Sequence, residues 1–509
     1  MKKILHTKHS IIYLFFAMIF LLQGYTIFKY AIFILFDEWL GRGLYPGIAF
    51  FNAFDFYEPK TGPHVTLYGW ATGLFYSLSG LANNPNISAW IAFALNIVSF
   101  FWVSYFLIQK ICLPNGSLQK VLFGWCLACL VFTLHLLDPT TEGISRIHAD
   151  LPSLLFLMLG ILFFLESREK DSEIYLSLCA LMLVLSAWAK LPTLFAIGFP
   201  LVVLLLEKQF RRGLHYFFYA LFCILLTTLI SGVAYGFEDM KFILWDHTQN
   251  HSWNDRNNLF NGEGAVNIKL TLFETIPFLF KFCLMYASEY FYFLFAALAC
   301  LTISFTNIID INVRRLLRSL GLTYFLLIPP CIAALAHFGG VENSLLLCNS
   351  IGIFCSLTLT FLLLSNYLSL RYVHLFYAFV CLVLILPLAR RAKSFDQDPN
   401  SSPQLQAFNY LYKGNTDVYF GWYPVSHALF DKSNLTCIEV PTWVGMNLPD
   451  EIDFSKNHFP EGAKYLATCH AGYGSTVLKY YLGKLEEVKA PPELSGWRLF
   501  QNSKFPSIQ

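Results

Sequence analysis

The sequence predicts an all-α polytopic membrane protein of about 11 transmembrane helices, followed by a small C-terminal α/β extracytoplasmic domain. Three observations predict this fold class: an apolar composition, a series of long apolar runs, and a tail of mixed composition. Of the 509 residues, 56% are hydrophobic and 13% are charged, which is more apolar surface than one soluble core can bury. The net charge of +2 gives no support to nucleic-acid binding.

Eleven apolar runs approach the roughly 20 residues that a helix needs to cross a membrane. They lie near 10–30, 88–109, 120–137, 150–166, 173–189, 191–206, 214–236, 284–306, 319–336, 344–364 and 371–388. The first run follows a basic start, as in a signal peptide, but it lacks a small-residue cleavage site and its hydrophobicity continues. We therefore expect a retained first helix.

The lysine and arginine residues of the short loops predict how these helices are oriented. A cytoplasmic N-terminus places most of the loop cations on the inner side. The run at 65–80 would invert every later loop if it crossed the membrane, so we expect it to lie on the surface or to re-enter. The run at 267–283 contains Glu274 and Lys281, which favours an interfacial helix.

This orientation leaves three substantial segments outside the cytoplasm: the loops 37–87 and 237–283 and the tail. We expect residues 1–389 to form the transmembrane domain and residues 390–509 to form the extracytoplasmic domain. Within the tail, "DVYFGWYP" and "KYLATCHAG" have the pattern of strands between Pro and Gly breaks. Cys437 and Cys469 also lie there, where an oxidising compartment could pair them. The inner loops are short and contain no Gly-rich phosphate loop.

Charged and polar side chains collect at the outer helix ends. They are Asp37, Glu38, Asp55, Lys60, His64, Arg146, His148, Asp150 and Lys190. These residues also have structural interpretations: charges at helix ends are commonly solvated, Arg146 and Asp150 have the spacing of a local ion pair, and Lys190 could snorkel to headgroups. His247 and His251 share a helical spacing but lack the Glu of a zinc-protease motif. We therefore predict no metal site, although a divalent cation is possible as a cofactor.

Several motifs together resemble a known superfamily. An outward acid after the first helix, then "GRGLYPG" and "FYEPKTGPHVTLYGWATGLFYSLSG", resemble the first loop of the GT-C glycosyltransferases, which include protein mannosyltransferases and aminoarabinose transferases. The helix "RIHADLPSLLFLMLGILFF" is similar to the superfamily's helix led by Arg and Asp, with His148 and Ala149 widening the spacing. The segment "AWAKLPTLFAIGFPLVVLLL" resembles its Lys-containing turn. The resemblance covers residues 10 to 240 and the overall plan of helices followed by an outward tail.

The resemblance implies transfer of a sugar from a polyprenyl-phosphate donor to an acceptor at the outer membrane face. The acid that ends the first helix would be the general base, and Asp37 matches its position. The neighbouring Glu38 is the other candidate, and at most one of the two faces the site because adjacent helical residues point about 100° apart. The acceptor could be a glycan, a lipid or a protein, and membrane lipids are the remaining partners. We expect a bacterial inner membrane with the active site facing the periplasm.

The donor phosphate needs cations to hold it. By the same resemblance, Arg146 and Lys190 would bind it, with Lys60 in reserve, and Asp150 would orient Arg146. The supporting residues would be His148, Asp55 and His64.

Two other classes of function stay open. A transporter or lipid flippase would place ionisable residues near the bilayer midplane on broken helices, and such proteins often have repeated halves. Here the charges gather at the outer helix ends, and no repeat is visible. A lipid-linked polysaccharide polymerase or ligase would share the donor but typically has a large Arg- and His-rich outer loop, and "HFGGVENS" at 337–344 is too short for one.

Overall fold

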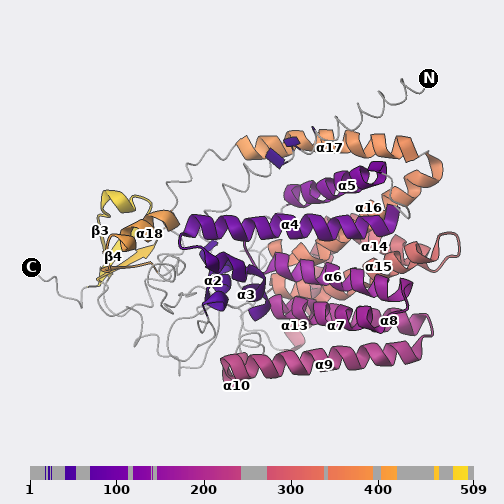
Figure 1. Cartoon of the computed structure of the whole chain (residues 1–509), viewed down its shortest axis with the longest axis horizontal. Helices are drawn as coiled ribbons and strands as arrows, with labels where there is room; N and C mark the ends of the chain where they lie inside the picture. The colour runs from indigo at the N-terminus through magenta and orange to yellow at the C-terminus, as the bar shows by residue number, and fades with distance from the viewer. Residues whose placement is uncertain are drawn as a thin grey trace, which may run out of the picture.

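The computed structural model describes residues 40–52, 69–112, 118–138, 140–141, 146–241, 272–336, 342–368, 370–393, 403–420, 464–468 and 485–502, with a few positions between 18 and 25. Most described residues are helical, and the long helices run side by side in one bundle (Figure 1). Several predictions lie outside the described residues. They are the first span, the roles of Asp37, Glu38, Asp55, Lys60, His64, His247 and His251, and the pairing of Cys437 with Cys469.

The helices, in chain order, have the following bounds: α2 (Leu40–Phe51), α3 (Trp70–Tyr76), the 3-10 helix η1 (Ser77–Leu81), α4 (Pro85–Cys112), α5 (Leu118–Leu137), α6 (Asp150–Glu169), α7 (Glu173–Ala189), the 3-10 helix η3 (Leu191–Gly198), α8 (Phe199–Leu206), α9 (Phe210–Tyr235), α10 (Phe237–Lys241), α13 (Leu272–Glu289), α14 (Phe291–Ser304), α15 (Ile311–Ala336), η5 (Glu342–Leu345), α16 (Leu346–Tyr367), α17 (Leu370–Lys393), α18 (Pro403–Tyr412) and η7 (Pro492–Leu494).

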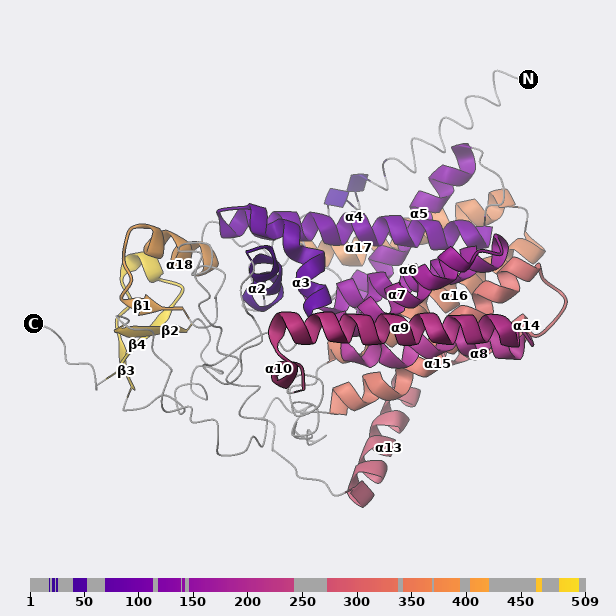
Figure 2. The ribbon, with the colours of Figure 1, turned by 60° about the horizontal axis from the view of Figure 1, so that its bottom comes forward.

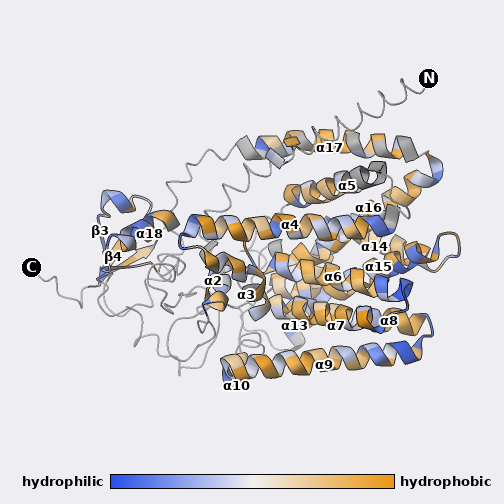
Figure 3. Ribbon diagram, viewed as in Figure 1, coloured by the Kyte–Doolittle hydropathy of each residue, from blue (hydrophilic) through white to orange (hydrophobic). Residues whose placement is uncertain are grey.

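Five of the described helices are long and apolar enough to cross a membrane, or six if a bent helix pair counts as one span. They are α4, α6, α9, α15 and α16, with α13 and α14 as the bent pair. Hydrophobic residues follow α9 along its length (Figure 3), and only 22% of its apolar window is buried. Because such a surface is stable only in lipid, the chain is a multi-pass membrane protein.

The prediction of eleven spans is only partly supported, since several predicted runs form shorter or broken helices. Helix α7 has 17 residues, fewer than the roughly 20 that cross a bilayer without help. The run at 191–206 is divided at Gly198 into η3 and α8. The predicted interfacial helix at 267–283 and the start of the next predicted span belong to one helix, α13, and an 84° bend then separates α13 from α14.

The segment near 65–80, predicted not to span, forms in its described part only the short helices α3 and η1. Both pack against α2, so that three short helices cover one end of the bundle. Figure 2 shows α2 and α3 beside the start of α4, on the side of the bundle that faces the small sheet. These short helices approach the polar residues where α6 begins and α7 ends.

The tail contains a four-stranded sheet packed with α18, as the sequence predicts for a small α/β module. Its strands are β1 (Val418–Tyr419), β2 (Tyr465–Thr468), β3 (Leu485–Val488) and β4 (Arg498–Asn502). Their order is β1-β2-β4-β3, with β1 and β2 parallel and the other pairs antiparallel; Leu466 pairs with Phe500. The strand predictions in "DVYFGWYP" and "KYLATCHAG" are confirmed by β1 and β2. Trp497 anchors α18 to the sheet by donating its indole N–H to the Pro403 carbonyl at 3.1 Å.

Candidate functional site

Four of the predicted site residues lie together at one end of the bundle. Arg146 and His148 precede α6, Asp150 is the first residue of α6, and Lys190 directly follows α7. Helices α6 and α7 form a tightly packed antiparallel pair, which brings the start of one beside the end of the other. Asp150 and Lys190, which are 40 positions apart in the sequence, therefore meet in one polar cluster.

Asp150 is the centre of this cluster, which we call the His148–Asp150–Lys190 cluster. One carboxylate oxygen hydrogen-bonds with Nδ1 of His148, and the other accepts from the ammonium of Lys190. The Asp150 side chain is 1% exposed and that of Lys190 is 13% exposed. A buried carboxylate is tolerated when it is paired and hydrogen-bonded, and the positive end of a helix dipole favours an acid in the first turn. The cluster meets both conditions.

The expected ion pair between Arg146 and Asp150 is not found among the described residues, where the two oxygens of Asp150 contact His148 and Lys190. The i, i+4 argument requires a helix over residues 146–150, and the helix begins only at Asp150. The backbone carbonyl of Arg146 instead accepts from the Asn96 side-chain amide of α4 at 3.1 Å.

Tyr76 and Asn96 fix the backbone that leads into α6. The hydroxyl of Tyr76 is placed to donate to Asn96 Oδ1 at 2.8 Å and to the carbonyl of His148 at 3.1 Å. Tyr76 is fully buried, and burial raises the pKa of its hydroxyl, which stays protonated and able to donate. These bonds hold His148 and Arg146 in place from two other helices.

The backbone around Lys190 is also fixed. Pro192, the second residue of η3, disfavours continuation of α7, so Lys190 adopts an extended conformation at φ −150° and ψ 117°. Its N–H donates to the Ser186 carbonyl at 3.0 Å, and its carbonyl accepts from the Thr193 hydroxyl at 2.9 Å. Ser153 Oγ on α6 donates to the Ser186 carbonyl at 3.0 Å. The turn therefore presents Lys190 to Asp150 from a rigid base.

Two glycines allow the first-loop segments to approach this site. A Cβ at Gly43, in the "GRGLYPG" motif, would overlap the backbone carbonyl of Ile147. A Cβ at Gly69 would overlap the carbonyl of Trp188. Only glycine permits backbone contact this close, so α2 and α3 pack directly onto the two segments that carry the His148–Asp150–Lys190 cluster.

Sequence reasoning did not single out Tyr76, Asn96 or the neighbouring tryptophans. Trp188 lies two positions before Lys190, and its ring centroid is 6.0 Å from that of Trp70; the Trp188 indole donates to Thr227 on α9 at 2.8 Å. Asn96 could have been found from the sequence, because an amide inside an apolar helix needs a hydrogen-bond partner. Among the described residues, no group of three or more His, Cys, Asp or Glu side chains could hold a metal ion.

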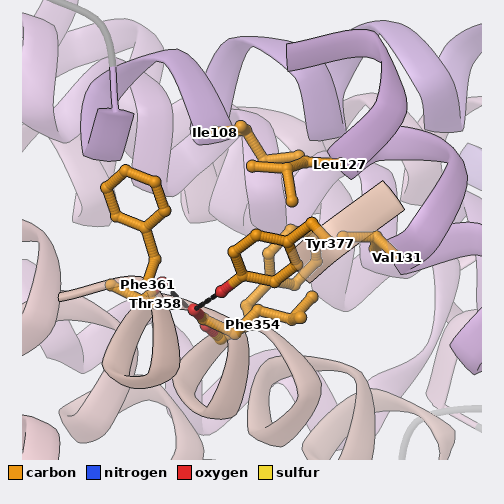
Figure 4. Close-up of a pocket in the computed structure, with 8 residues that line it drawn as sticks. Ile108, Leu127, Val131, Phe354, Thr358, Phe361 and Tyr377 are labelled. Carbon is orange, nitrogen blue, oxygen red and sulfur yellow. Dashed lines mark hydrogen bonds between the residues drawn. The ribbon is translucent and has the colours of Figure 1, made fainter. Parts of the chain in front are cut away.

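A separate small cavity lies between α4, α5, α16 and α17 (Figure 4). Its lining residues are Ile108, Leu127, Val131, Phe354, Leu357, Thr358, Phe361 and Tyr377. The Tyr377 hydroxyl reaches the Leu357 carbonyl at 3.4 Å. The lining is almost entirely apolar and includes none of the predicted site residues, so this cavity offers no group for sugar or phosphate chemistry.

Comparison with known proteins gives one kind of match. No protein-family model and no curated protein matches the chain. Among solved structures, the chain is similar to ArnT from Cupriavidus metallidurans bound to undecaprenyl phosphate. That likeness has 11% sequence identity and a TM-score of 0.49, and it covers 96% of this chain and 97% of that chain. At this identity and TM-score, function has to be argued from the residues of the chain itself.

Proposed function

We propose that the chain is a membrane glycosyltransferase that moves a sugar from a polyprenyl-phosphate donor to an acceptor at the outer membrane face. The observation that carries the proposal is the His148–Asp150–Lys190 cluster, which lies at the end of apolar membrane helices and beside the loop segment that resembles the GT-C superfamily. A site at this depth receives a lipid-anchored substrate directly from the bilayer.

Lys190 is the proposed ligand of the donor phosphate. An ammonium has three donors, and Asp150 occupies one of them, which leaves two for phosphate oxygens. Its side chain is partly exposed, whereas Asp150 is buried, so the cation lies on the open side of the pair. Arg146 is the second proposed phosphate ligand and Lys60 the reserve.

Asp150 is better suited to holding the site than to acting as a base. Both of its oxygens are engaged by cationic or hydrogen-bonding partners, which stabilise its charged form and weaken it as a proton acceptor. We therefore keep Asp37 as the proposed general base, with Glu38 as the alternative. One base is sufficient, because a sugar phosphate already carries a good leaving group and needs cations more than a second acid.

The direct test is mass spectrometry of polyprenyl-linked sugars in native-host membranes that contain wild-type protein or a variant at matched expression. Asp37→Asn and Lys190→Gln are both expected to let one lipid-linked sugar accumulate. Loss of a general base typically slows transfer by about 10²–10⁴, and loss of Lys190 removes a proposed ligand of the donor phosphate. Glu38→Gln is the matched control and is expected to have a milder effect. An unchanged pool in the presence of intact Asp37→Asn protein would contradict the proposal.

A lipid flippase or transporter is the second candidate, and the 84° bend between α13 and α14 is the observation that favours it. Broken helices line the substrate sites of many transporters. The same membranes distinguish the two functions: a flippase variant changes on which face the lipid-linked sugar lies, whereas a transferase variant changes how much of it remains unused. The sugar and the acceptor are identified by the species that accumulates and the glycan that is lost.

A further inference from the structure

The opposite end of the bundle carries a dense group of arginines that the proposed reaction does not use. Figure 3 shows hydrophilic residues at the ends of α6, α9 and α15 that point away from the small sheet. The arginine cluster consists of Arg168, at the end of α6, Arg212, near the start of α9, and Arg315 and Arg318, in the first turns of α15.

The last turn of α6 brings these arginines together. Arg212 donates to the carbonyl of Ser167 at 2.5 Å, and Arg315 reaches the next carbonyl, that of Arg168, at 3.4 Å. The carbonyl end of a helix carries partial negative charge and attracts cations. Both guanidinium groups are also close enough to Arg168 to repel its charge. Three positive groups therefore meet at one helix turn.

Too few acids lie among them to balance the charge. Glu207 is shared between Arg168 and Arg318, and Asp171 pairs with Arg212 at 2.8 Å. Among the described residues, Arg315 pairs with no carboxylate, and its guanidinium makes the long hydrogen bond to the Arg168 carbonyl. Four arginines thus share two carboxylates, which leaves two positive charges unbalanced among these six side chains.

The cluster also contains buried donors that have no acceptor. The Nε atoms of all four arginines are buried without a hydrogen-bond partner in the described part of the chain. Arg168 is only 6% exposed, and a buried, unpaired donor on a charged group is costly. An anion bound at the partly exposed side chains of Arg212, Arg315 and Arg318 would balance the charge of the cluster.

The surroundings of the cluster identify that anion as a lipid. The arginines lie where the apolar helices α6, α9 and α15 end or begin, and the ends of membrane-spanning helices are where headgroups are expected. Large apolar side chains beside them are exposed, as acyl chains require; they are Leu205, Leu206, Phe210 and Leu214. Basic pockets between membrane helices bind the headgroups of anionic lipids. We propose that the arginine cluster binds the phosphate of an anionic phospholipid.

Lipid titration of the purified full chain tests this proposal. The protein, in neutral detergent, is titrated with phosphatidylglycerol or phosphatidylcholine, and native mass spectrometry counts the bound lipids. We expect the wild type to prefer phosphatidylglycerol. Arg315→Gln should weaken phosphatidylglycerol binding about fivefold, since one arginine near a lipid surface contributes about that much. Arg211→Gln, which removes an exposed arginine next to the cluster, should leave binding unchanged.

Three outcomes would overturn the proposal: equal binding of the two lipids by the wild type, equal effects of Arg315→Gln and Arg211→Gln, or full competition by millimolar inorganic phosphate, which would indicate a site for free phosphate. Heat unfolding without lipid verifies that Arg315→Gln is folded. Arg315→Lys keeps the positive charge but loses the planar fork, so it should retain most of the phosphatidylglycerol preference if Arg315→Gln proves unstable. The test does not depend on the proposed transferase activity.

Discussion

The two ends of helix α6 both carry buried charged side chains, but the charges are paired in different ways. At its start, one carboxylate, that of Asp150, is buried and engaged by exactly one partner on each oxygen. At its end, Arg168 belongs to a network in which Glu207 is shared by two arginines, and of the acids and arginines in these pairs only Asp171 is exposed. The first cluster is small and specific, whereas the second is large and redundant.

This difference predicts how each end responds to mutation. Removing one partner of a buried charge leaves that charge uncompensated, which is strongly destabilising. In a shared network, the partner that remains still compensates the buried charge, so one substitution leaves no charge unpaired. The start of α6 should therefore be sensitive to single substitutions, and its end should tolerate them.

The largest effect is expected for Lys190→Met. Asp150 would keep only His148, so the free energy of unfolding should fall by about 3 kcal/mol, the lower end of the range for breaking a buried pair. Chemical unfolding in detergent micelles measures it. Adding Asp150→Leu to Lys190→Met removes the stranded charge and should recover most of the loss, because apolar replacements of buried ion pairs are often neutral or stabilising. A single variant as stable as the wild type would contradict the pairing.

The next effect is expected for Gly43→Ala. The new methyl group would overlap the Ile147 carbonyl, which pushes α2 away from the start of α6 and should destabilise the protein by about 1–3 kcal/mol. The control is Gly198→Ala, since a Cβ there has no heavy atom within 4 Å and the backbone is ordinary, at φ −74° and ψ −19°. If both variants unfold alike, the close approach at Gly43 is not the cause.

The sequence predicts which charged residues gather at this end of α6 better than it predicts how they pair. Arg146, His148, Asp150 and Lys190 were singled out by their position at helix ends, and the structure brings them together. The partner of Asp150 was predicted wrongly, because Arg146 precedes the helix and Lys190 is brought close only by the packing of α6 on α7. Local spacing predicts contacts within an element, whereas contacts between elements depend on tertiary packing.

Fold prediction had a similar limit. Hydropathy placed the long helices well, because each apolar run has to be helical in lipid. Hydropathy could not predict where an apolar run is broken, since the break at Gly198 and the 84° bend after α13 leave the average hydropathy unchanged. The hydrophobic periodicity of the sequence also does not predict where the short helices α2 and α3 pack, because their position depends on close backbone contacts at Gly43 and Gly69.

A smaller effect is expected at the other end of α6. Arg318→Gln removes one of the two arginines on Glu207, and Arg168 keeps the other contact. The free energy of unfolding should fall by less than it does for Lys190→Met, because Glu207 keeps Arg168 as a partner and is not left uncompensated. Chemical unfolding in detergent micelles measures the difference. A loss as large as that for Lys190→Met would show that the network is not redundant.

The smallest effect is expected for a pair with no buried member, Glu487 and Arg498 on neighbouring strands β3 and β4. The Arg498 guanidinium donates to both carboxylate oxygens, at 2.7 and 2.5 Å, and this holds the pKa of Glu487 below its ordinary value of 4.5. A lowered carboxylate pKa stabilises the folded state above pH 4.5, and this contribution is lost as the pH falls through the pKa of the folded state.

Glu487→Gln should therefore unfold slightly more easily than the wild type at pH 7 and match the wild type at low pH. Melting of the full chain across this range checks the sign, and solvent screening keeps the difference small. If this exposed pair mattered as much as the pair between Asp150 and Lys190, burial would not be what makes the Asp150 pair strong.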